Sequence, residues 1–66
     1  MTLRQMRLSR GWTVKDLEHE CYSHGGVSAK TIERAERGVK IDEVMAWRLA
    51  RALDCETPEE IEGLNY

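Results

Sequence analysis

Signals that start and stop helices recur along the whole chain and leave room only for short helices. Five residues of the types that cap helix N-termini stand at intervals along it: Thr2, Thr13, Ser28, Asp42 and Thr57. Glycine readily adopts the left-handed backbone conformation that ends many helices. Glycines follow each of the first three helical segments, at Gly11, at Gly25 and Gly26, and at Gly38. No segment alternates polar and apolar residues for long enough to predict a strand. The pattern therefore predicts an all-α protein with five short helices around one core.

Apolar residues recur at helical spacing in each of these segments, which predicts the side that each helix buries. The inward sets are Leu3 and Met6, then Val14, Leu17 and Cys21, then Ile32 and Ala35, then Val44, Met45, Leu49, Ala52 and Leu53, and finally Ile61.

A chain of 66 residues predicts one domain, spanning residues 1–66. Its longest apolar run is far below the roughly 20 residues that a membrane span requires, so no membrane association is expected. The N-terminal residues are polar and basic without an apolar signal region, which favours a cytoplasmic protein. Cys21 and Cys55 are therefore expected to be reduced thiols that pack as small hydrophobic groups.

The net charge of −2 conceals an asymmetry between the two halves of the chain. Residues 1–40 carry eight basic and five acidic side chains, whereas residues 41–66 carry two basic and seven acidic ones. A basic half allows one face to bind a polyanion despite the acidic total, and the acidic half can meet a protein partner.

The segment from residue 25 to residue 38 reads GGVSAKTIERAERG, which is a glycine turn followed by a short helix over residues 29–37. Lys30, Glu33, Arg34 and Arg37 are expected on the outer side of this helix. Together with the helix that Thr13 starts, it predicts a helix-turn-helix unit over residues 13–37. In that arrangement the second helix lies in the major groove of DNA.

Three linked motifs strengthen this interpretation: LRQMRLSRGWTVKDLE, then GVSAKTIERAERG, then RLARALDC. Over residues 3–61 the chain resembles the Cro/repressor-type, or Xre, family of helix-turn-helix proteins. The resemblance implies a lambda-repressor-like fold and sequence-specific binding of double-stranded DNA as a transcriptional regulator, most often a repressor. It also implies a homodimer on the operator and a bacterial or phage origin, with the protein on the nucleoid when it is DNA-bound.

The resemblance further implies roles for particular residues. The expected base contacts are Ala29, Lys30, Thr31, Glu33 and Arg34. The expected phosphate contacts are Arg10, Thr13, Lys15, Ser28, Arg37 and Lys40. Arg7 and Glu36 match a structural ion pair of the family, and Ile61, Leu64 and Tyr66 are the expected dimer interface.

The chain departs from the family pattern between the two helices of the unit. Val14 stands where Gln is common, and Glu18 stands where a small Ala is usual. About four extra residues separate Leu17 from the turn glycine, which is consistent with a second helix that is one turn longer. Counted back from Ile32 instead, the small-residue position falls on the bulky Tyr22, so that either the turn is enlarged or the two helices pack further apart.

Other functions fit the residues less well. His19, Cys21, His24 and Cys55 invite a zinc or redox-sensor interpretation, but they lack the paired spacing of a structural zinc site. Without a phosphate loop, a nucleophile motif or a paired-carboxylate pocket, no enzymatic activity, cofactor or metal is expected. The remaining alternative is a protein–protein interaction module, an antirepressor or adaptor, built on the same fold.

Overall fold

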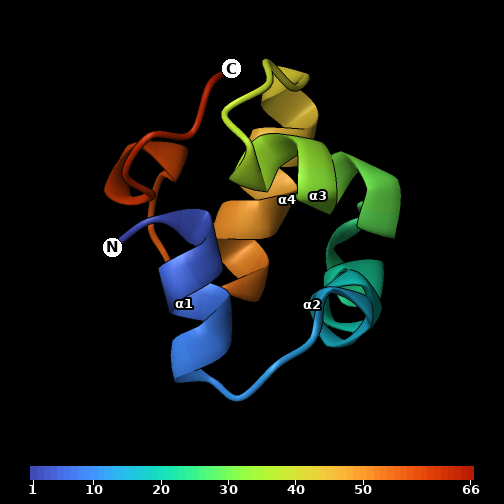
Figure 1. The fold of residues 1–66 in the computed structure, drawn as a ribbon. Helices are drawn as coiled ribbons and strands as arrows, with labels where there is room; N and C mark the ends of the chain where they lie inside the picture. The colour runs from blue at the N-terminus through green and yellow to red at the C-terminus, as the bar shows by residue number, and fades with distance from the viewer.

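The structure is a computed structural model that describes residues 1–66. It contains four α-helices: α1 (Leu3–Ser9), α2 (Val14–Cys21), α3 (Ala29–Glu36) and α4 (Glu43–Ala52). Two short 3-10 turns complete it, η1 (Tyr22–His24) and η2 (Pro58–Glu60). In Figure 1, α4 runs through the middle of the molecule, with α1 and α2 on either side of it and α3 across the front. The predicted all-α class is confirmed.

The helices begin where the capping residues predicted. Thr2 accepts a hydrogen bond from the backbone of Gln5, and the Gln5 side chain accepts one from the backbone of Thr2. Thr13 and Asp16 form the same reciprocal box at the start of α2. Such boxes satisfy backbone N–H groups that have no partner within the helix, so these helix starts are encoded locally.

The predicted fifth helix is wrong, because the segment makes only the single turn η2. The Glu60 carboxylate accepts hydrogen bonds from the backbones of Glu56 and Thr57, which closes one turn. Ile61 is then extended, at φ −94° and ψ 105°, and enters the core with 2% of its surface exposed. Burying Ile61 ends the turn before a helix can propagate beyond its costly first hydrogen bonds.

One contiguous core joins all of these elements. Its residues are Leu3, Leu17, Cys21, Val27, Ile32, Ala35, Ile41, Ala46, Leu49, Ala50, Ala52, Leu53, Cys55 and Ile61. The inward assignment of Val44 is wrong, since this side chain is 53% exposed on the outer side of α4. Cys21 and Cys55 are buried free thiols.

The C-terminal segment is fastened to the rest of the chain by backbone hydrogen bonds. Glu62 donates to the carbonyl of Met1, and Ile41 donates to the carbonyl of Asn65. In Figure 1 this segment runs beside the N-terminal end of α1. No helix combines the length and the apolar character that crossing a membrane requires.

Candidate nucleic-acid interface

The candidate interface is built on α2 and α3, which pack against each other and against the core. Ile32 and Ala35 of α3 are buried, as predicted, and this fixes which side of the helix faces solvent. Lys30, Glu33 and Arg34 are exposed on that outer side. The geometry presents a short polar helix whose length and exposure suit insertion into a DNA groove.

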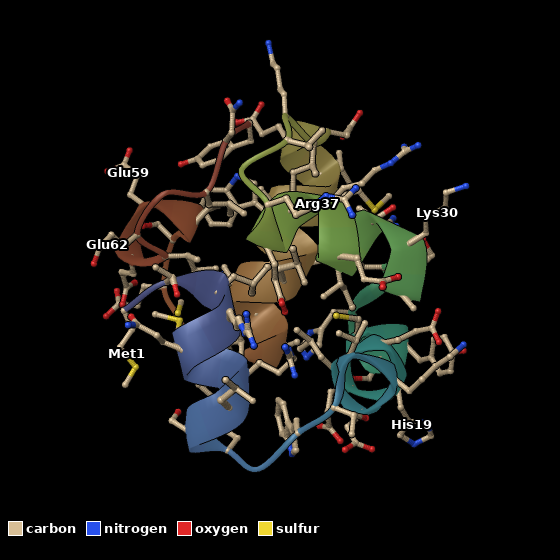
Figure 2. The ribbon with its side chains drawn as sticks, viewed as in Figure 1. Met1, His19, Lys30, Arg37, Glu59 and Glu62 are labelled. Atoms are coloured by element: carbon tan, nitrogen blue, oxygen red, sulfur yellow. The ribbon has the colours of Figure 1, made fainter.

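Six of the ten basic residues make neither an ion pair nor a side-chain hydrogen bond within the chain: Arg4, Lys30, Arg34, Arg37, Lys40 and Arg51. Four of these six lie between residues 30 and 40, on α3 and the turn after it. Figure 2 shows Lys30 on α3 at the right and Arg37 at the C-terminal end of α3, while Glu59 and Glu62 lie on the C-terminal segment at the left of the view. We call residues Lys30, Arg34, Arg37 and Lys40 the α3 cation cluster.

The three remaining residues of the predicted contact set at the start of α3 differ in their exposure. Ala29 and Thr31 are half-buried. Ser28 caps the helix by accepting a hydrogen bond from the Thr31 backbone, and its hydroxyl donates to the Thr31 hydroxyl at 3.0 Å. Ser28 itself is exposed, so its cap lies at the open N-terminal end of α3.

The connection between α2 and α3 is an enlarged turn rather than a longer α-helix. After Cys21 the chain makes the 3-10 turn η1 and then passes through Gly25 and Gly26, with φ of +108° and +93°. Arg48 of α4 donates to the carbonyl of Gly26 at 3.1 Å. The same guanidinium lies against Gly25, where a Cβ would approach its Nε to 2.6 Å. Positive φ therefore favours glycine at both positions, and the close approach of Arg48 adds a second requirement at Gly25 alone.

Glu18 holds the other end of this turn. Its Oε2 accepts a hydrogen bond of 2.7 Å from the backbone of Ala29, at the first residue of α3. Sequence reasoning noted Glu18 only as a departure from the family pattern and did not assign a role to Arg48. The only signal in the sequence was the unusual residue type at Glu18, because both interactions depend on how the enlarged turn folds back.

Two of the predicted phosphate contacts, Arg10 and Lys15, differ in whether the side chain is free to bind a ligand. The Arg10 guanidinium donates to the carbonyl of Leu53 at 2.9 Å and lies 3.4 Å from the Asp54 carboxylate, at the C-terminal end of α4. It also stacks over the ring of Trp12, 5.2 Å from the centroid. Lys15 is 81% exposed and pairs loosely with Glu18 at 3.5 Å. Arg10 is thus held by the fold, whereas Lys15 can reach a ligand.

Arg7 connects α1 to the C-terminal end of α3. Its Nε and Nη2 donate to the two carboxylate oxygens of Glu36, at 2.6 and 3.1 Å, and its Nη1 donates to the carbonyl of Trp12 at 2.9 Å. Both side chains are about nine-tenths buried. The hydrogen bonds that Arg7 donates to Glu36 raise the pKa of Arg7, so the guanidinium stays charged. Its planar, bidentate geometry fixes the orientation of α3 relative to α1.

The residues that suggested metal or redox sensing do not form a cluster. No group of three His, Cys, Asp or Glu side chains lies close enough to hold a metal ion. His19 instead packs edge-to-face on Tyr22, with ring centroids 5.7 Å apart. Burial raises the pKa of Cys21 to about 11, aided by the nearby carboxylates of Glu20 and Glu18, so this thiol stays protonated at neutral pH.

The helices α2 and α3 are joined by a turn, and the exposed side of α3 carries basic side chains without partners in the chain. This arrangement is that of helix-turn-helix proteins. A family model described as "Helix-turn-helix" matches residues 3–60, and the chain belongs to this family, which is the Cro/Xre type that its motifs resemble. Members of the family are DNA-binding transcription regulators. No curated protein and no solved structure matches the chain.

Proposed function

We propose that this protein binds double-stranded DNA in a sequence-specific manner and acts as a transcriptional repressor, with α3 in the major groove. The α3 cation cluster carries this proposal. The chain neutralises several of its other basic side chains internally and leaves these four unpaired, on one helix and its following turn. An unpaired set of cations on an exposed helix is the electrostatic footprint of a polyanion ligand.

Within this proposal, Lys30 and Arg34 read bases, because each can donate to the O6 and N7 of guanine. Glu33 lies between them in sequence and accepts from cytosine N4, and the methyl group of Ala29 packs on a thymine methyl. Thr31 supports this set, since its hydroxyl is already bonded to Ser28.

Phosphates are contacted by Lys15, Arg37 and Lys40, and by Ser28 and Thr13 at the starts of the two helices. Arg10 is not among these contacts, because its guanidinium is held at the end of α4. The protein acts in the cytoplasm, on the nucleoid, as a homodimer on the operator and without enzymatic activity.

The experiment that tests the proposal is selection of bound sequences from random duplex DNA, followed by affinity measurements over a range of salt concentrations. Each phosphate contact should contribute roughly −0.9 to the slope of log K against log salt. Absent binding at low salt, or binding without a salt slope, would refute DNA binding.

Three variants separate the assigned roles. Arg34→Ala should lose roughly 1–3 kcal/mol at one base position and relax the preference there. Lys40→Ala should weaken binding to all sequences equally and make the salt slope about 0.9 shallower. Arg4→Ala removes an exposed, unpaired cation from α1 and is the matched control, with unchanged binding expected. If Arg34→Ala and Lys40→Ala both leave operator binding unchanged, the assignments are incorrect.

One observation favours the alternative of a protein-binding antirepressor or adaptor. Carboxylates of the chain itself occupy the N-terminal ends of both helices, Asp16 at Thr13 and Glu18 at Ala29. These are the positions at which a helix dipole would otherwise attract a phosphate. In the same selection experiment, this alternative predicts no enriched DNA sequence at any salt concentration.

A further inference from the structure

The outer side of α4 carries an apolar surface that no other part of the chain covers. Val44 is 53% exposed and Trp47 is 38% exposed. They line a groove of about 370 Å³ together with Glu43, Arg48, Arg51 and, from η1, His24. Large exposed aromatic and aliphatic side chains that share one groove mark a surface for association.

Charged residues bracket this surface in a regular order. Glu43, Trp47 and Arg51 are spaced by four residues, so they form one line along α4 with Trp47 at its midpoint. Glu43 lies in the first turn and Arg51 in the last, and neither makes an ion pair within the chain. We call Glu43, Val44, Trp47 and Arg51 the α4 stripe.

The order of charges in the α4 stripe is complementary to itself. If two α4 helices pack antiparallel about a two-fold axis through Trp47, Glu43 of each copy lies opposite Arg51 of the other. The two indole rings then meet at the axis, and Val44 of each copy flanks them. A two-fold interface requires one surface to match itself in this way. A stripe with the same charge at both ends would not meet that requirement.

We propose that the α4 stripe is a homodimer interface, occupied by the α4 stripe of a second copy and formed without DNA. This interface differs from the one predicted at Ile61, Leu64 and Tyr66. Ile61 is buried in the core. The segment that carries Leu64 and Tyr66 is held to the rest of the chain by the backbone hydrogen bond between Ile41 and Asn65. Ten residues of helix span only about 15 Å, so the contact belongs to the small, transient class of interfaces. Dimerisation therefore depends on protein concentration.

Sedimentation equilibrium of the purified chain without DNA tests this interface. The mass should rise from 7.6 kDa toward twice that value as concentration increases. Glu43→Arg alone, or Arg51→Glu alone, places like charges opposite each other twice in the dimer and should weaken association at least about tenfold. An equimolar mixture of the two variants should restore it, because each pair then joins opposite charges. The double variant should restore it for the same reason.

Controls separate this effect from general changes in charge or folding. Glu59→Arg and Arg4→Glu reverse exposed charges elsewhere on the chain and should leave the dimer unchanged. Circular dichroism melts should show that each variant is folded. Trp47→Ala should weaken association at least about tenfold, because the aromatic anchor at the axis is lost.

Two outcomes would overturn the proposal. One is a monomer at every concentration, which would leave the groove to a different protein partner. The other is a dimer that persists in both single charge reversals, which would place the interface on another surface. Neither outcome bears on DNA binding, since the measurements contain no DNA and leave the α3 cation cluster unchanged.

Discussion

The Arg7–Glu36 ion pair gives the sharpest test of how this fold is held together. In Glu36→Ala, the Arg7 guanidinium loses the acceptors of two of its three hydrogen bonds and keeps only the Trp12 carbonyl. The pair is about nine-tenths buried, so water cannot replace the lost acceptors without a rearrangement. Breaking a buried pair on one side costs about 3–5 kcal/mol. A domain of 66 residues has a total free energy of unfolding of roughly 3–10 kcal/mol.

The assay is thermal and urea unfolding followed by circular dichroism. A loss of about 3 kcal/mol should lower the melting temperature by roughly 12–24 °C. Lys15→Ala is the matched control, because it breaks an ion pair whose lysine is 81% exposed and should cost less than about 1 kcal/mol. Replacing both partners, Arg7→Met with Glu36→Met, should recover much of the loss, since no unpaired charge is left buried.

If Glu36→Ala costs no more stability than the exposed control, the Arg7–Glu36 pair is energetically equivalent to a surface contact and does not hold the fold together. A second contradicting result is a Glu36→Ala variant that loses DNA binding at an unchanged melting temperature. That result would make Glu36 a ligand-contacting residue instead of a structural one.

Other perturbations have equally definite outcomes. Gly25→Ala should destabilise the fold by about 1 kcal/mol more than Gly26→Ala, because only the substitution at Gly25 displaces the Arg48 guanidinium. Urea unfolding measures this difference, and in an Arg48→Met background the difference should disappear. Burial raises the folded-state pKa of Cys21 to about 11 from an ordinary value near 9.0, so its contribution to stability is complete below pH 9 and is lost as the pH rises toward 11. Melts across that range should therefore fall more steeply for the native chain than for Cys21→Ala, and equal slopes would contradict the assignment. Glu18→Gln keeps an oxygen that accepts the hydrogen bond from the Ala29 backbone but removes a negative charge from the N-terminus of α3. DNA affinity should therefore rise at nearly unchanged stability, and a fall in affinity at unchanged stability would contradict this.

Much of the helical framework was predictable because its signals are local. Thr2 and Thr13 cap helices through partners three residues away, and Ile32 and Ala35 face inward because of helical spacing. The exposure of the cationic residues on α3 followed from the same spacing. The fifth helix failed as a prediction, since its capping signals were correct but the burial of Ile61 ended the turn.

The sequence by itself determined the helix starts, the inward residues of α3 and the family to which the chain belongs, because these depend on neighbours within about one helical turn. Only the tertiary structure decided which basic side chains remain free to bind a ligand. Arg10 is bound to Asp54, a residue 44 positions away, and Arg48 reaches back 22 positions to hold the glycine turn. Such partners depend on how the helices pack, and packing also left Val44 exposed on α4 instead of in the core. Local chemistry therefore set the elements, while contacts between distant residues selected the surfaces that can bind.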